Sequence, residues 1–253
     1  MSAARALVGC SGYRYAHWRG VLYPPGLPEA GWLPRYAERF DTVELNATFY
    51  RLPSEDTVRR WAGRAPRGFV LAAKLSRYGT HMKRLLDPGD WLPTFLGRIE
   101  LLGAALGPVL VQLPPRMRPD PERLARFLEV APRRHRWAVE FRDPRWLTPR
   151  VLGVLRDAGA ALCVHDLLPG HPREPTADWV YLRFHGPRAG QPYTGSCSPQ
   201  AIAGAARRIR RHLGEGRDAY AYFNNDAGGD AVRDALALRG RLGLPAEPAG
   251  GHW

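Results

Sequence analysis

Eight short apolar segments, spread along the whole chain, constrain the fold of this sequence more than any other feature. Each has the length of a β-strand, and most end in a group of polar residues. Their apolar residues are continuous and do not alternate with polar ones, which is typical of parallel strands covered on both faces. The segments are residues 6–10, 42–46, 69–74, 108–113, 137–141, 161–166, 179–185 and 220–225.

Helical patterns fill most of the intervals between these segments. Ser54 is predicted to cap one helix, with Glu55 and Asp56 in its first turn. Pro121 and Pro149 suit the first turn of two later helices, where no N–H donor is needed. The predicted helices cover residues 29–39, 54–62, 90–105, 121–130, 148–158, 199–213 and 229–240.

The interval after the sixth segment is different. Residues 167–178 read LLPGHPREPTAD, and this proline content predicts an irregular crossover instead of a helix. Eight strands alternating with helices predict a single (β/α)8 TIM barrel, one domain over residues 1–253 with a core of about residues 5–242. A doubly wound open sheet is the alternative, but the chain has no G-x-G-x-x-G fingerprint after the first segment and no P-loop.

Several classes of protein are disfavoured by composition. No apolar run approaches the roughly 18 residues of a membrane span, and the apolar patch near the amino end is too short for a secretory signal. Cys10, Cys163 and Cys197 are widely spaced, which predicts neither a disulfide framework nor a zinc site. The cysteine pattern therefore favours a cytoplasmic location, and a catalytic thiol is disfavoured because Cys10 and Cys163 lie in apolar runs.

The charge of the chain has two interpretations. Its formal net charge of +13 favours an anionic partner, such as nucleic acid or a phosphorylated metabolite. Almost all the cations are arginines spread along the chain, however, and Lys74 and Lys83 are the only lysines. Together with the many Ala, Gly and Pro residues, this pattern also fits a GC-rich coding bias, so both interpretations stay open.

Chemically versatile side chains gather at one end of the predicted strands. In a (β/α)8 barrel the carboxyl ends of the strands form the active site, and the opposite ends here carry plainer residues. This asymmetry predicts an enzyme, and analogy with other barrels favours hydrolysis of a glycosidic or phosphoester bond in an oxygen-rich or anionic small molecule. The candidate catalytic residues are Glu44, Lys74, His81, Glu140 and His185. The candidate substrate-binding residues are Tyr13, Asn46, Tyr50, Gln112, Arg142, Arg183, Tyr193, Asn224 and Asn225.

Lys74 is unusual in this set. In a chain that uses arginine for nearly every positive charge, a lysine at a strand end indicates that a compact or titratable amine is needed. Pairing with Glu44 or Glu140 is the expected role. Binding of a phosphate or carboxylate and formation of a Schiff base are the alternatives.

The carboxylates of the rim also have two interpretations. Glu44 and Glu140 can act as acid and base on a glycosidic bond, but the common retaining glycosidases of this fold have their pair after strands 4 and 7. Gln112 and Arg183 stand there in this chain, so that mechanism does not transfer. A divalent metal is the alternative cofactor, although the spacing forms no metal motif. The possible metal ligands are Glu44, Glu140, Asp166 and Asp226.

The last segment ends abruptly in polar residues. Asn224 and Asn225 are predicted to be hydrogen-bonding groups of the rim, followed by glycines that let the backbone approach a ligand. Asp230 is predicted to cap the last helix. Asp226 disfavours a bare phosphate here, so the expectation is either a bound cation or a neutral, hydroxyl-rich ligand group.

Seven motifs in chain order resemble the DUF72 family, also called UPF0759 or YecE-like. They are GCSGYRYAHW, ELNATFY, KLSRYGTHMKRL, QLPPR, AVEFRDPRW, WVYLRFHGP and FNNDAGGDA, within residues 7–240. The resemblance implies a TIM barrel and supplies no function. This chain departs from the family pattern at Tyr13, Asp143, Arg145 and Cys197, which puts in doubt any role for position 143 and the fine specificity of the pocket.

Two further functional hypotheses come from other classes. The positive charge, with aromatic residues near the rim, is compatible with a nucleic-acid-binding protein or a nuclease. A barrel that binds a small molecule without catalysis is the other. The oligomeric state is not predicted, and the tail, residues 243–253, has too little periodicity for a helix.

Overall fold

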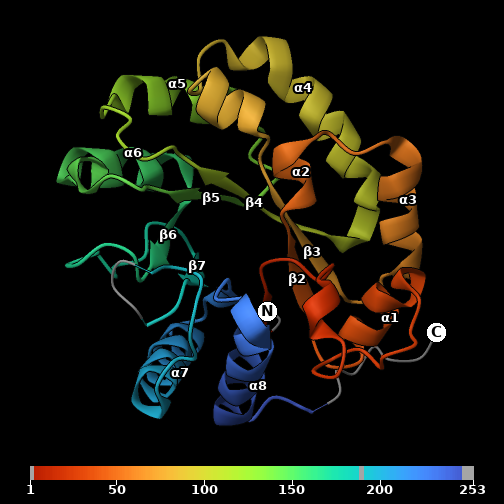
Figure 1. The fold of residues 1–253 in the computed structure, drawn as a ribbon. Helices are drawn as coiled ribbons and strands as arrows, with labels where there is room; N and C mark the ends of the chain where they lie inside the picture. The colour runs from red at the N-terminus through yellow and green to blue at the C-terminus, as the bar shows by residue number, and fades with distance from the viewer. Residues whose placement is uncertain (1–2, 188–190, 247–253) are drawn as a thin grey trace.

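The computed structural model describes residues 3–187 and 191–246; residues 247–253 of the tail lie outside this part. Its centre is a parallel sheet in the order β1-β8-β7-β6-β5-β4-β3-β2, and the helices lie around it (Figure 1). The strands are β1 Ala6–Cys10, β2 Thr42–Leu45, β3 Val70–Lys74, β4 Leu106–Gln112, β5 Trp137–Glu140, β6 Ala161–His165, β7 Trp179–Phe184 and β8 Asp218–Phe223. The predicted (β/α)8 barrel is therefore confirmed.

The helices follow the predicted positions, with a few differences at their ends. Ser54 caps its helix by accepting a hydrogen bond from the Thr57 N–H at 3.3 Å, and Pro121 and Pro149 open α5 and α6 as predicted. The helices are α1 Trp32–Ala37, α2 Ala47–Tyr50, α3 Glu55–Arg64, α4 Pro88–Ile99, α5 Pro121–Val130, α6 Pro149–Ala158, α7 Pro199–Gly214 and α8 Asp230–Leu242.

Three predictions about helices were wrong in detail. The helix expected over 29–39 is a 3-10 turn, Glu29–Gly31, followed by the short α1, and the one over 90–105 becomes a 3-10 helix after α4, Glu100–Ala105. Asp230 is the first residue of α8 and not its cap. Gly229 precedes it with φ +76°, a left-handed conformation that glycine adopts without strain, so this glycine serves the turn.

Apolar side chains fill the barrel and the layer between strands and helices. Alternate residues of each strand point inward, as the pleat requires. The inner cluster is rich in aromatic rings, with Trp179, Tyr181, Tyr220 and Tyr222 from β7 and β8. The outer layer is formed by two larger clusters, one around β8, β1 and β2 and the other around β3 to β6.

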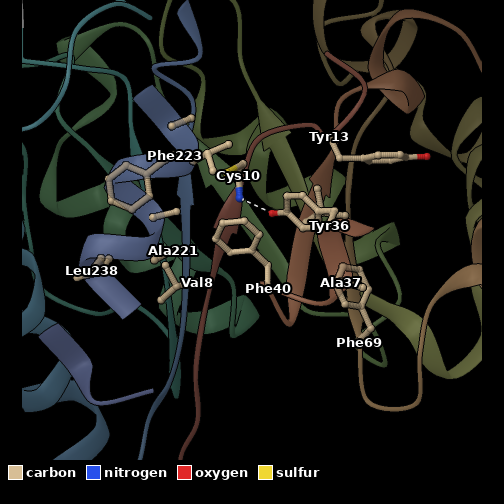
Figure 2. Close-up of a cluster of buried hydrophobic side chains, with 14 of the residues drawn as sticks. Val8, Cys10, Tyr13, Tyr36, Ala37, Phe40, Phe69, Ala221, Phe223 and Leu238 are labelled. Atoms are coloured by element: carbon tan, nitrogen blue, oxygen red, sulfur yellow. Dashed lines mark hydrogen bonds between the residues drawn. The ribbon is translucent and has the colours of Figure 1, made fainter. Parts of the chain in front are cut away.

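The seam between β1 and β2 is closed by a side chain. The Cys10 N–H donates to the Tyr36 hydroxyl at 2.7 Å, and that hydroxyl donates to the Thr42 carbonyl at 3.0 Å; Figure 2 shows the first of these bonds within the surrounding apolar cluster. Gly9 makes this approach possible, because a Cβ there would lie 2.1 Å from the Thr42 oxygen. A backbone pair, Ser11 with Glu44, continues the seam toward the carboxyl end.

The crossover between β6 and β7 carries no helix, as its prolines predicted. Residues 166–178, all of which the structure describes, form only bends, turns and loop, and the chain between β6 and β7 runs as loop in Figure 1. The crossover is tied to the start of β6 by Thr176, whose hydroxyl donates to the Ala160 carbonyl and accepts from the Leu162 N–H, both at 2.7 Å.

Among the residues that the structure describes, none of the helices has both the length and the apolar character needed to cross a bilayer.

Candidate active site

The barrel interior becomes charged at the carboxyl ends of the strands. Glu44, Lys74, Gln112, Glu140 and Arg183 come from five strands. The last four stand two residues after members of the inner cluster, and Glu44 stands two residues after the buried Thr42. The register places Gln112 beside Glu140. The structure therefore brings together five of the residues that the sequence singled out.

Arg183 is the centre of this group. Its guanidinium donates to Glu44 at 2.7 Å and to Glu140 at 2.5 Å. All three side chains are completely shielded from solvent. One arginine from β7 therefore joins the carboxylates of β2 and β5 across the barrel.

The carboxylates of Glu44 and Glu140 also accept hydrogen bonds from residues other than Arg183. Glu44 accepts hydrogen bonds from the Ser11 hydroxyl and from the Tyr181 hydroxyl, the latter at 2.6 Å. Glu140 accepts from the Arg142 guanidinium. Burial, the largest single cause, raises the pKa of these two carboxyls, but the charge of Arg183 and the other nearby cations and donors together outweigh it, so the net pKa is lowered in both. Both carboxylates are therefore ionised and fully engaged at neutral pH.

Lys74 has a different environment from the one expected. It is the last residue of β3 and only 8% exposed, yet its ammonium makes no ion pair or hydrogen bond with any residue that the structure describes. The expected pairing with Glu44 or Glu140 is wrong, because Arg183 occupies both carboxylates. The Lys74 ammonium lies 4.4 Å from the centre of the Phe49 ring instead.

The protonation of Lys74 is shifted toward neutral pH. Burial, and then the charge of Arg183, lower its pKa to about 8, and the two carboxylates oppose this only in part. An amine with this pKa is charged at pH 7 and exchanges its proton readily one unit higher. Lys74 is thus the titratable group of the site.

His81 also contacts Phe49. It belongs to a single π-helical turn, Tyr78–Met82, and its ring stands edge-on to Phe49 with centroids 5.0 Å apart. Burial and the charge of Lys74 lower the pKa of His81 to about 4, so the ring is neutral at pH 7. Tyr50, next to Phe49, is 76% exposed and borders the site.

Arg142 lies closer to solvent than the ion pairs of Arg183. It donates to the Tyr193 hydroxyl at 3.1 Å and to the Gln112 side-chain oxygen at 3.3 Å, besides its bond with Glu140. Its side chain is 14% exposed. Arg142, Gln112 and Tyr193 therefore form one connected set of polar groups above the buried ion pairs.

His185 lies beneath Arg142 and is completely buried. Its Nδ1 contacts the Asp166 carboxylate at 3.0 Å, and its Nε2 lies 3.3 Å from both Arg142 and Arg183. Burial is the main cause that lowers the pKa of His185. A neutral ring with its proton on Nδ1 fits this geometry, since Nε2 then accepts from the guanidiniums. His185 thus positions Arg142 and is separated from solvent by it.

Two predicted residues, Tyr13 and Asn46, lie at the border of the charged group. Tyr13 is buried with its ring 6.4 Å from Tyr36, and it lines a cavity of about 160 Å³ together with Asn46. Asn46 donates to the Ser11 hydroxyl at 2.9 Å, and its amide oxygen is buried without a partner among the described residues.

The polar end of β8 is mostly structural. Asn224 continues the inward series after Tyr222, but the fully buried Asn225 donates to Asp234 of α8 at 2.7 Å and to the Gly195 carbonyl at 2.8 Å. Asp226 accepts from the Trp18 indole at 2.6 Å and contacts His17. Burial raises the pKa of Asp226 to about 6. These side chains attach the end of β8 to its neighbours, which the sequence did not reveal.

The four carboxylates considered as metal ligands do not converge. Glu44 and Glu140 are bound by arginines, Asp166 by His185, and Asp226 by Trp18. Within residues 3–187 and 191–246, no group of three or more His, Cys, Asp or Glu side chains is arranged to hold a metal ion. The residues present do not fit the divalent metal that the sequence allowed.

Two contributors were missed when residues were selected from the sequence: Phe49 and Tyr181. Tyr181 was detectable, because it stands two residues before Arg183 and so faces inward on the same strand.

A cavity of about 600 Å³ also exists at the opposite, amino-terminal end of the barrel. Arg239 and Asp41 in its lining pair with each other at 3.0 Å, and Arg5 and Arg67 are its other charged residues.

The fold and this group of residues together define a (β/α)8-barrel protein with a polar, partly titratable site at the carboxyl ends of its strands. The chain belongs to the DUF72 family: the family model described as "Protein of unknown function DUF72" matches residues 7–251.

Two curated relatives agree with this assignment. The chain is 24% identical over 246 residues to UPF0759 protein YunF of Bacillus subtilis (strain 168), a match covering 83% of this chain and 86% of that protein. It is 31% identical over 115 residues to UPF0759 protein YecE of Escherichia coli (strain K12). The latter match covers 45% of this chain and 42% of that relative.

Solved structures of the family share the fold. A DUF72 family protein from Thermotoga maritima MSB8 superposes with a TM-score of 0.82 at 28% identity, covering 94% of this chain and 99% of that one. A DUF72 family protein from Enterococcus faecalis V583 gives 0.79 at 20% identity, covering 95% and 96%.

Proposed function

We propose that the rim of the barrel is the active site of a hydrolase that acts on an anionic, oxygen-rich small molecule. The observation that carries the proposal is Lys74. It is a nearly buried amine without a carboxylate partner, and burial lowers its pKa to about 8. Titratable groups in such environments are concentrated at catalytic sites.

The charge balance of the site favours an anionic substrate. Lys74, Arg142 and Arg183 supply three positive charges, and Glu44 and Glu140 supply two negative ones. The excess cation is Lys74, and the partly exposed guanidinium of Arg142 is the other group open to a ligand. A phosphate or carboxylate group bound between them fits this arrangement.

The neighbouring groups suit the rest of an oxygen-rich molecule. Gln112 and the Tyr193 hydroxyl lie beside Arg142 and supply hydrogen-bonding groups for substrate hydroxyls. Glu44 and Glu140 act in this proposal by holding Arg183, and His185 by positioning Arg142. They therefore do not form a glycosidase acid–base pair.

The proposed chemistry is proton transfer by Lys74. Its ammonium donates a proton to the leaving-group oxygen as the phosphoester or glycosidic bond breaks. Water supplies the new oxygen, and the neutral ring of His81 accepts the proton that the water releases. Lys74 regains its proton from solvent after the product leaves.

The pH dependence of turnover tests this assignment. Screening aryl phosphates and phosphorylated aryl glycosides identifies a substrate. The value of kcat/KM is expected to fall as pH rises through about 8, because the Lys74 ammonium is then lost, and to fall below about 4, where His81 becomes protonated. Undiminished kcat/KM at pH values above the pKa of Lys74 contradicts the proposal.

The low pKa of Lys74 also favours a second candidate function, Schiff-base formation with a carbonyl substrate. Borohydride reduction during turnover, followed by mass spectrometry of tryptic peptides, separates the two. A substrate-sized adduct on Lys74, with Lys83 unmodified, supports the Schiff base; a hydrolase gives no adduct.

A further inference from the structure

The crossover without a helix leaves a gap in the outer layer of the barrel. A cavity of about 470 Å³ lies there, between the loop after β6, strand β7 and helix α7. Its lining includes Val164, Leu182 and Arg208. Val164 is only partly buried, because no helix of this crossover covers it. The gap is therefore accessible from the outside of the barrel, away from Lys74.

A second cavity, of about 590 Å³, adjoins this one along α7. It is lined by Arg173 from the crossover and by Arg207, Arg208 and Arg211 from α7. Arg173 and Arg208 border both cavities. We call the two cavities with these four arginines the α7 groove.

The four arginines are not paired with the carboxylates around them. None of them forms an ion pair or hydrogen bond with a carboxylate in the part of the chain that the structure describes. The two glutamates of the groove are directed to other partners: Glu174 pairs with Arg156 at 3.8 Å, and Glu215 pairs with Arg217.

Crowding of the arginines supports the same conclusion. Burial, and then the charges of Arg173 and Arg211, lower the pKa of Arg208. A bound polyanion relieves this mutual repulsion. Asp166, which also lines the first cavity, is held by the backbone and ring N–H groups of His185.

We infer that the α7 groove binds the phosphodiester backbone of a nucleic acid. A single phosphate needs one or two arginines, whereas four arginines along two adjoining cavities match a chain of phosphates. Guanidiniums dominate the charged lining, so the contacts are with phosphates and the binding does not depend on base sequence. A nucleic acid bound in the α7 groove then accounts for part of the net positive charge of this chain.

A salt titration tests the inference. The full chain is titrated into a fluorescein-labelled single strand of about 20 nucleotides, and anisotropy is followed from about 50 to 300 mM NaCl. The double variant Arg207→Gln/Arg211→Gln is expected to bind at least about tenfold more weakly, and its log–log salt slope is expected to shrink by about 1.4, the value for two lost contacts.

The matched control is Arg59→Gln/Arg60→Gln on α3. Both residues are exposed, and the control removes the same charge, so a change of less than about threefold is expected for diffuse attraction alone. The variant Lys74→Met is expected to bind like the parent protein, since Lys74 lines neither cavity of the groove.

Four outcomes overturn the inference. They are the absence of binding at the lowest salt, equal weakening in both arginine double variants, loss of binding in Lys74→Met, and displacement of the strand by poly-glutamate as effectively as by unlabelled DNA at equal charge. The last outcome assigns the groove to an acidic protein. Thermal unfolding of each variant shows whether weaker binding comes from misfolding.

Discussion

Replacing Arg183 by methionine is expected to lower the free energy of unfolding by about 3–5 kcal/mol, or to prevent folding altogether. The substitution leaves Glu44 and Glu140 without the guanidinium that now bonds both, and both carboxylates are completely buried. An unpaired charge in the barrel interior is costly because water cannot reach it.

Urea denaturation at two pH values measures this effect. In the variant Glu44 has no ion pair left among the described residues, whereas Glu140 keeps Arg142. The pKa of Glu44 is then expected to be raised, so the folded state takes up a proton and loses stability as pH rises above about 4.3, the ordinary value for Glu. In the parent protein the pKa of Glu44 and Glu140 is lowered, so the corresponding stability is lost as pH falls. The difference between the two proteins is therefore larger at pH 7 than at pH 5.

The control for this experiment is Arg14→Met. Arg14 pairs with Glu29 at 2.6 Å on the surface, with the two side chains 60% and 58% exposed. Loss of such a pair is expected to cost less than about 1 kcal/mol. An equal effect of the two substitutions contradicts the central place given to Arg183.

Replacing Lys74 by methionine is expected to abolish turnover and to stabilise the fold. The pKa of Lys74 is lowered from 10.5 to about 8, and at about 1.4 kcal/mol per pH unit this corresponds to about 3 kcal/mol against the charged amine. Methionine has a similar length and packs on Phe49 without a charge. The free energy of unfolding of the variant is therefore expected to be about 1–3 kcal/mol higher than that of the parent protein at pH 7. Lys74 in the parent protein would then lower stability in exchange for function.

The pH dependence of the stability difference between Lys74→Met and the parent protein shows whether the difference comes from the charge of Lys74 or from better packing of methionine. Above pH 8 the folded parent protein releases a proton that the unfolded chain keeps until about 10.4, so the stability of the parent rises with pH in this interval. The advantage of Lys74→Met therefore shrinks between these pH values. The control Lys83→Met, at a surface ion pair with Asp87, is expected to change neither stability nor turnover. A destabilised but active Lys74→Met variant contradicts the assignment.

The architecture and the location of the site were predictable from local patterns. Continuous apolar segments and capped helices define the strands and helices, and the polar ends of the strands place Glu44, Lys74, Gln112, Glu140 and Arg183 at one rim. The prolines of residues 167–178 also predicted the missing helix correctly. These features depend on residues that are close together in the sequence, and local sequence patterns therefore predict them.

The pairing within the site was not predictable, because it depends on side-chain reach across the barrel. Arg183 and Lys74 are both cations at strand ends, and only the structure shows that the longer, forked side chain takes both carboxylates. The roles of Asn225 and Asp226 were also hidden. A polar residue past a strand end can face either the site or the helix behind it. Asn225 and Asp226 both bond to structural partners outside the site.

The pKa of Lys74 is the most direct test of the account. Reductive methylation with ¹³C-formaldehyde labels Lys74, Lys83 and the amino terminus, and Lys74→Met identifies the Lys74 signal in NMR spectra. A titration midpoint near 8 is predicted from the burial of the amine beside Arg183. A midpoint at or above about 10, the ordinary range for lysine, contradicts the claim that Lys74 is the titratable group of the site.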